Sequence, residues 1–190
     1  MACGEKFAHF SRNPLDLLRD PTVERLVDEI LDTYVPSGRL LLVLPCSARK
    51  PYGSSPSQRL YWWAARQAVP EEGILERASL SGIYGIVPAC FEDRVANYNF
   101  NLNRACFTQG KHEEIVELLA DRVCHFLSRH GQSFEAIIAY GRERYWDVMQ
   151  VVAYRLQVGN LWVVPRKGAS LRREGLDELQ RLLHRLAGKL

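Results

Sequence analysis

Hydrophobic positions along the chain follow two patterns, short apolar runs and longer stretches with a helical repeat. Leu40–Leu44 and Ala136–Tyr140 are apolar without polar alternation, which is typical of strands buried on both faces of a parallel sheet. Ile74–Ser81 and Asn160–Val164 are the other expected strands. A repeat of about 3.6 residues predicts helices between the strands. They are a helix that opens at Asp20-Pro21 and ends before Pro36, then Ser57–Ala68, Lys111–Arg129, Arg142–Leu156 and Ser170–Leu186.

Strands that alternate with helices predict right-handed crossovers and a sheet covered on both sides. We therefore expect one α/β domain over residues 1–190, a three-layer α/β/α sandwich with a short, mainly parallel central sheet of about four strands. Residues 1–20 are an N-terminal extension, with a short amphipathic piece around Leu15 to Leu18. Residues 82–109 lack a clear period. A segment this long inside a compact domain is either functional or wrongly assigned.

Charge and cysteine content narrow the class of protein. Among 190 residues, 25 Lys and Arg oppose 22 Asp and Glu, a net charge of +3 that permits a nucleic-acid partner without implying one. The five cysteines are odd in number and contain no CxxC pair, and no segment resembles a signal peptide or membrane helix. These features predict a cytoplasmic protein with free thiols and no membrane association. The histidines lack metal-binding spacing, so no metal and no cofactor are expected.

The polar stretch that follows the first strand is the best candidate for chemistry, because open α/β sheets bind ligands at the carboxyl ends of their strands. Cys46 is a candidate nucleophile, with Arg49 and Lys50 placed to favour a thiolate, or else a buried cysteine that ends a strand. Lys50 is a ligand-binding or basic group, or a surface lysine. Ser54, Ser55 and Ser57 supply hydroxyls to a ligand or cap the next helix. The stretch lacks the Gly-Lys-Ser of a phosphate-binding loop.

Residues 82–109 carry a second group of candidates. The adjacent acids Glu92 and Asp93 suit recognition of an amine or general acid-base chemistry, or else they are solvated loop residues. Tyr98, Phe100 and Phe107 either stack on a nucleobase or pack in the core.

Two sequence blocks resemble the core domain of the archaeosine synthase family. That family has Pro-Cys, three residues, Lys-Pro-Tyr, two residues, Ser, two residues and His. In PCSARKPYGSSPSQ the matching residues are Pro45, Cys46, Lys50, Pro51, Tyr52 and Ser55, while Gln58 stands in place of the histidine. In GIVPACFED the matching residues are Gly85, Val87, Pro88 and Glu92, and Tyr98 resembles a family tyrosine further on. The part of the chain that resembles this core domain covers residues 40–165.

The resemblance implies a fold similar to that of uracil-DNA glycosylases, with the loops after the first and last strands lining a base pocket. The family acts on tRNA that bears 7-cyano-7-deazaguanine and adds an amine, lysine in its known reaction, across the nitrile. By this resemblance Cys46 is expected to attack the nitrile, Glu92 to hold or deprotonate the amine, and Lys50 and Tyr52 to protonate or orient the imidate nitrogen. The substrate-binding residues implied are Pro51, Tyr52, Ser55, Gln58, Gly85, Pro88, Tyr98, Arg166 and Lys167.

Two departures from the family leave several functions open. Gln58 replaces the family histidine, and full-length archaeosine synthases are longer, with a transglycosylase-like region and an RNA-binding PUA domain. A stand-alone archaeal tRNA-modifying transferase is the first expectation. The alternative is a non-catalytic nucleobase- or tRNA-binding subunit whose partner subunit supplies the RNA-binding domain. Glycosylase activity is disfavoured, because the first loop has no Asp or Asn to activate water.

Overall fold

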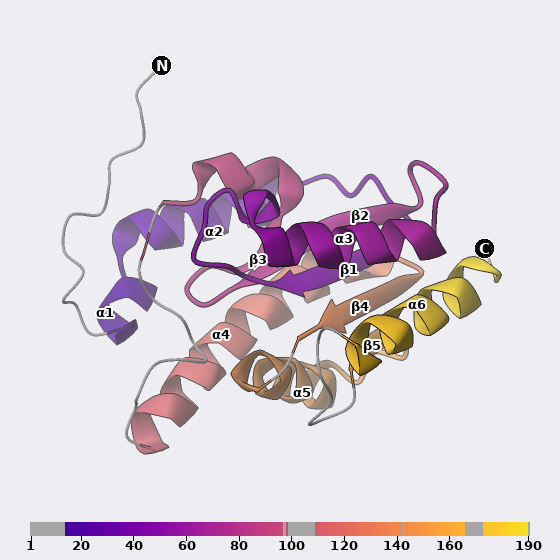
Figure 1. Ribbon diagram of the computed structural model, residues 1–190. Coiled ribbons are helices and arrows are strands. Elements are labelled where there is room, and N and C mark those ends of the chain that lie inside the picture. The colour runs from indigo at the N-terminus through magenta and orange to yellow at the C-terminus, as the bar shows by residue number, and fades with distance from the viewer. Residues whose placement is uncertain (1–13, 97, 99–108, 142, 166–172, 190) are drawn as a thin grey trace.

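A computed structural model describes residues 14–96, 98, 109–141, 143–165 and 173–189. The elements run from α1 (Pro14–Leu18) and α2 (Pro21–Thr33) through β1 (Leu40–Pro45), α3 (Pro56–Ala68), β2 (Leu75–Ser81) and β3 (Gly85–Pro88) to α4 (Gln109–His130), β4 (Ala136–Tyr140), α5 (Arg144–Leu156), β5 (Leu161–Val164) and α6 (Glu174–Ala187). Three short 3₁₀ helices are η1 (Tyr52–Ser54), η2 (Ala89–Arg94) and η3 (Gly131–Ser133). Figure 1 shows their arrangement.

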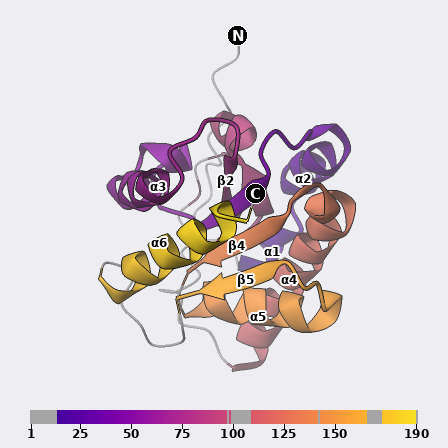
Figure 2. The same ribbon diagram turned by 90° about the vertical axis from the view of Figure 1, so that its right-hand side faces the viewer.

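The expected three-layer α/β/α sandwich is confirmed. The five strands have the order β3-β2-β1-β4-β5, and all neighbouring pairs are parallel except β2 and β3. In Figure 2, α3 and α6 cover one face of the sheet and α2, α4 and α5 lie across the other. Among the described helices, none is both long and apolar enough to cross a membrane.

Strand β1 occupies the middle of the sheet and contributes to a hydrophobic core on each face. Leu40, Leu42 and Leu44 pack in the core beneath α3 and α6, whereas Leu41 and Val43 pack in the core formed with α2, α4 and α5. All five side chains are buried, and complete burial of each contributes about 2 kcal/mol. This two-sided burial explains why the sequence of β1 has no polar alternation.

The start of α2 has the predicted cap. The side chain of Asp20 accepts a hydrogen bond from the backbone N–H of Thr22, and Pro21 stands at the first helical position. Proline costs nothing there, because the first N–H groups of a helix have no partner within the helix.

The sheet has one more strand than the sequence predicted. The additional strand, β3, lies within the segment 82–109 and pairs antiparallel with β2 after the turn at Gly82–Tyr84. β3 is only four residues long and is bounded by Gly85 and Pro88, residues that favour turns, so neither length nor periodicity indicated a strand. Gly85 and Pro88, expected to bind substrate, are both buried in this edge strand.

Gly85 occupies a backbone position that excludes other residues. Its φ of 76° is left-handed, and a Cβ there would lie 2.9 Å from the Cβ of Arg122 on α4. Arg122 is itself held in place by hydrogen bonds to the carbonyls of Ile83 and Leu18.

Gly85→Ala is therefore expected to lower the free energy of unfolding by about 2 kcal/mol, from the left-handed backbone, with a further loss from the close contact. Chemical denaturation measures it. Gly159→Ala is the matched control, because nothing lies within 4 Å of the added Cβ. Equal stability of the two variants would contradict a role for Gly85 in the β2–β3 turn.

Candidate functional site

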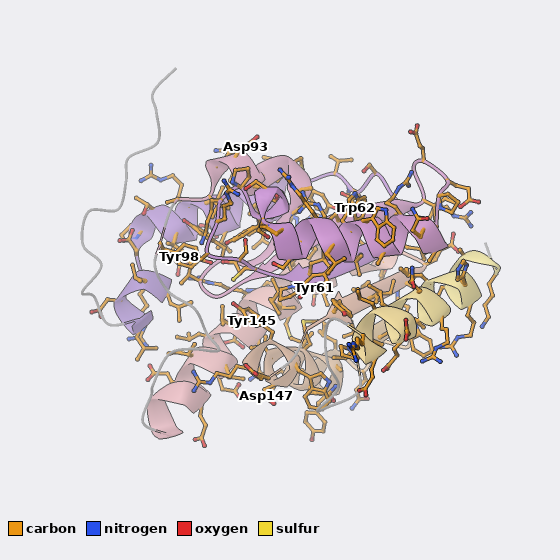
Figure 3. All side chains as sticks on the ribbon, in the orientation of Figure 1. Tyr61, Trp62, Asp93, Tyr98, Tyr145 and Asp147 are labelled. Carbon is orange, nitrogen blue, oxygen red and sulfur yellow. The ribbon has the colours of Figure 1, made fainter. Side chains whose placement is uncertain are left out.

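The site lies where the path of the chain changes direction across the sheet. From β1 the chain crosses through α3 to β2 on one side, and from β4 it crosses through α5 to β5 on the other. Such a switch point leaves a crevice at the carboxyl ends of the two central strands. The arrows of β1 and β4 point to the same end of the sheet in Figure 1, and Figure 3 labels Tyr98 and Tyr145 at that end.

Cys46, the first residue after β1, meets the beginning of α5 in this crevice. Its Sγ lies 2.8 Å from the hydroxyl oxygen of Tyr145, and either atom is able to donate the hydrogen bond. A cavity of about 10 Å³ lies beside this contact, lined by residues that include Pro45, Gly141 and Trp146. That volume accommodates about one water molecule.

Two further buried tyrosines, Tyr52 and Tyr98, lie on the same side of the sheet end as Cys46 and form a hydrogen-bonded group. The hydroxyls of Tyr52 and Tyr98 lie 2.9 Å apart, and each lies within hydrogen-bond distance of Ser81 Oγ, at 3.1 and 2.8 Å. The hydroxyl of Tyr98 also points towards Cys46 Sγ at 4.0 Å. Burial raises the pKa of both Tyr52 and Tyr98 well above the usual value for tyrosine, so both phenols remain protonated at neutral pH.

Lys50 places a cationic group next to the thiol. Its Nζ lies 3.8 Å from the centre of the Tyr98 ring and donates a hydrogen bond to the carbonyl of Ser47 at 3.1 Å. Burial lowers the pKa of Lys50, and negative charge on Cys46 acts in the opposite direction. Among the described residues, the ammonium is thus stabilised by an aromatic face and, when the sulfur is ionised, by the charge of Cys46.

A second polar cluster holds both ends of the Cys46 loop. The carboxylate of Glu92, 3% exposed, accepts two hydrogen bonds from Arg77, at 2.6 and 3.0 Å. It also accepts one from Ser79 at 3.0 Å and one from the backbone N–H of Gly53 at 2.9 Å. Both of its oxygens are therefore engaged, and the Gly53 bond fixes the loop where it enters α3.

Gln58 completes this cluster at the other end of the loop. Its amide nitrogen donates to the carbonyl of Pro45 at 2.8 Å and to Ser79 at 3.0 Å, and its amide oxygen accepts from Arg77 at 3.1 Å. The side chain is fully buried. Gln58 thus fixes the residue immediately before Cys46.

The structure separates the expected site residues into groups. Cys46, Lys50, Tyr52 and Tyr98 come together around the thiol, while Glu92 and Gln58 lie in the second cluster. Ser55 caps α3 by accepting from the backbone N–H of Gln58, which agrees with the capping alternative. Arg166, Lys167, Phe100 and Phe107 lie outside the described residues.

Pro51, another residue expected to bind substrate, lines a surface groove of about 340 Å³ together with Arg59, Trp62 and Asp93. The peptide bond between Lys50 and Pro51 is cis.

Within the described ranges no group of three or more His, Cys, Asp or Glu side chains is placed to hold a metal ion.

Sequence reasoning did not single out Tyr145, Arg77, Ser79 or Ser81 as site residues. Tyr145 lies in the expected helix Arg142–Leu156 and follows the strand end at Tyr140-Gly141 by four residues. That spacing from a predicted strand end was the one available signal. Arg77, Ser79 and Ser81 are polar residues spaced two apart in an expected strand, so they share one face of the sheet.

Comparison with known proteins identifies the family. Residues 23–183 match the family described as Domain of unknown function (DUF5591). The chain belongs to this family. It is 29% identical over 133 residues to archaeosine synthase from Methanocaldococcus jannaschii, covering 69% of this chain and 22% of the relative. It is 27% identical over 139 residues to archaeosine synthase subunit alpha from Thermococcus kodakarensis, covering 72% of this chain and 23% of the relative.

The expected resemblance to the archaeosine synthase family is thereby confirmed, and the chain spans less than a quarter of the length of either relative. Among solved structures, the crystal structure of AF0587, a protein of unknown function, has a similar fold. The TM-score is 0.60 at 23% identity, over 83% of this chain and 49% of that chain.

Arg77→Met is expected to lower the free energy of unfolding by about 3 to 5 kcal/mol, because it leaves the buried carboxylate of Glu92 without its cation. Denaturant titration measures it. The control is Arg39→Met, which removes an exposed partner of Glu135 and is expected to cost less than about 1 kcal/mol. Similar losses in both variants would argue against the Arg77–Glu92 pair as an anchor of the loop.

The pKa of Lys50 is expected to lie below the usual value for lysine, because burial disfavours the ammonium. Cys46→Ala is expected to lower it further, since the variant removes the negative charge that favours the ammonium. NMR titration of ¹³C-methylated lysines measures both effects, with the Lys50 resonance assigned from Lys50→Arg. A titration midpoint for Lys50 at or above the usual value for lysine would contradict this environment.

Proposed function

We propose that this chain is a cytoplasmic tRNA-modifying domain of the archaeosine synthase type, and that Cys46 adds to the nitrile of 7-cyano-7-deazaguanine. The observation that carries the proposal is the position of Cys46. The thiol stands at the switch point of the sheet, between a cation and a phenol, at the end of the matched Pro-Cys block. The similarity to two archaeosine synthases supplies the substrate class.

The reaction proceeds in two steps. The sulfur of Cys46 attacks the nitrile carbon, a C–S bond forms, one π bond of the nitrile breaks, and its nitrogen takes up a proton to give a thioimidate. A donor amine then adds to the same carbon, the C–S bond breaks, and the sulfur leaves with a proton. The product is an amidine, and Cys46 is regenerated.

Charge around the thiol supports the first step. The Lys50 ammonium favours the thiolate and the negative charge that develops on the nitrile nitrogen. The buried phenols of Tyr52 and Tyr98 give the site a polar wall that needs no rearrangement during the reaction.

Glu92 serves this reaction by holding the loop. Its carboxylate is bound by Arg77, Ser79 and the Gly53 N–H, so we assign it a positioning role in place of the amine-binding role that the family resemblance implied. Gln58 has a similar positioning role, because its amide nitrogen holds the carbonyl of Pro45.

We also propose that a partner subunit supplies the RNA-binding domain.

Intact-mass spectrometry of the protein mixed with 7-cyano-7-deazaguanine, free and within a tRNA transcript, tests the covalent step. We expect a gain equal to the mass of the whole nitrile compound, because the addition releases nothing. Cys46→Ala is expected to lose the adduct. Cys90→Ala is expected to keep it, since Cys90 is a free cysteine exposed on η2.

Two outcomes would contradict this assignment. An adduct that persists in Cys46→Ala would place the reaction at another residue. Complete amidine formation by Cys46→Ser would rule out a covalent thioimidate.

A non-catalytic subunit that binds the nucleobase or tRNA is the second candidate. It is favoured by Gln58, which replaces the family histidine and whose amide nitrogen is committed to Pro45 and Ser79. The name of the Thermococcus kodakarensis relative describes a subunit, in keeping with a divided enzyme. Saturable binding without a mass gain in the same experiment would favour this function.

A further inference from the structure

Tyr145 is the closest hydroxyl to the Cys46 sulfur among the contacts that the described residues make. Its oxygen lies 2.8 Å from Sγ, whereas the hydroxyl of Tyr98 lies at 4.0 Å. Tyr145 stands in the first turn of α5 and is 3% exposed, so its ring is fixed by packing. A phenol held this close to a sulfur is within range to exchange a proton with it.

Among the described residues, no other titratable side chain makes a hydrogen bond to the sulfur as short as that of Tyr145. The hydroxyls of Tyr52 and Tyr98 are engaged with each other and with Ser81 on β2. The ammonium of Lys50 lies over the Tyr98 ring and donates to the carbonyl of Ser47. Lys50 therefore acts on the sulfur through its charge, and Tyr145 acts through a direct hydrogen bond.

We propose that Tyr145 is a catalytic residue that carries the proton between the sulfur of Cys46 and the nitrogen of the substrate. This proposal rests on the proposed function and assigns its proton path. In the first step the thiol donates its proton to Tyr145 Oη while Tyr145 donates its own proton to the nitrile nitrogen. The C–S bond forms as one C–N π bond breaks, and the neutral thioimidate holds the proton that began on sulfur.

The second step uses the same path in reverse. When the amine adds to the thioimidate carbon, its surplus proton passes to Tyr145, and Tyr145 returns a proton to the departing sulfur. The C–S bond breaks, the amidine leaves, and Cys46 is again a thiol. Tyr145 is a neutral phenol before and after each step, so no other base is needed.

The variant Tyr145→Phe tests proton transfer by Tyr145 separately from the nucleophilicity of the Cys46 sulfur. Addition of 7-cyano-7-deazaguanine needs a proton to move from the sulfur to the nitrile nitrogen, whereas alkylation of the ionised thiol by iodoacetamide needs no proton transfer. We expect nitrile addition to fall about 100-fold in Tyr145→Phe. Alkylation of Cys46 at a pH where the thiol is fully ionised is expected to match the wild type, which also shows that the variant is folded.

Tyr154→Phe is the matched control, because Tyr154 lies on the same helix and is 80% exposed. It is expected to leave both rates unchanged. The alkylation pH profile adds a readout that does not depend on the substrate. Its midpoint is expected to move to higher pH in Tyr145→Phe, because the thiolate loses a hydrogen-bond donor.

The outcomes distinguish this proposal from the proposed function. A Tyr145→Phe protein that adds the nitrile as fast as the wild type overturns the proton path alone. An unchanged alkylation midpoint overturns the contact between Tyr145 and Cys46. A wild-type protein that adds no nitrile overturns the proposed function, and the proton path with it.

If Tyr145→Phe does not fold, 3-fluorotyrosine at position 145 preserves the hydroxyl and increases its acidity. The pH profile of nitrile addition is then expected to move to lower pH. An unmoved profile overturns the proposal.

Discussion

The burial of β1 on both faces constrains where this molecule is able to hold reactive groups. The central strand β1 is covered by helices on each side and paired with a parallel strand on each edge, so the side chains of Leu40–Leu44 are all buried. The chain first gains access to a ligand where the strand ends. Cys46 is the residue at that point, and the helices and loops that surround it all derive from the crossovers that cover β1.

The loop that carries Cys46 depends on buried polar contacts rather than on hydrophobic packing alone. Gln58 holds the carbonyl of Pro45, and Glu92 holds the N–H of Gly53, so the two bonds lie on either side of the reactive residue. Both side chains are joined through Arg77 and Ser79 on β2. Because every member of such a cluster is satisfied by another, the loss of one leaves the others buried without partners.

Much of the architecture was predictable from the sequence, because the hydrophobic pattern of a two-sided sheet is unambiguous. The four parallel strands, the cap at Asp20 and the alternation of strands with helices all follow local rules. β3 was not predictable, since its pairing depends on a long-range hydrogen-bond ladder with β2 and on a turn that only Gly85 permits.

The candidate site was predictable only where it is local in sequence. Cys46 and Lys50 belong to one loop and were found by motif and by position. Tyr145 lies 99 residues from Cys46, and its place shortly after a predicted strand end was the one local signal that distinguished it from a core aromatic. Likewise, the sequence drew attention to the acid Glu92 as an amine-binding, acid-base or solvated residue, but its partner Arg77 could be found only once β2 and η2 were brought together.

The distance between thiol and phenol is set by the packing of α5 against the sheet. Cys46 follows β1 and Tyr145 belongs to α5. Val43 and Ala139, which are paired in register on β1 and β4, belong to the same hydrophobic core as Tyr145 and line the small cavity together with it. The hydrophobic core on this face, against which Cys46 also packs, therefore holds the phenol at a fixed position relative to the sulfur, so a change in core packing is also a change in the geometry of the reactive atoms.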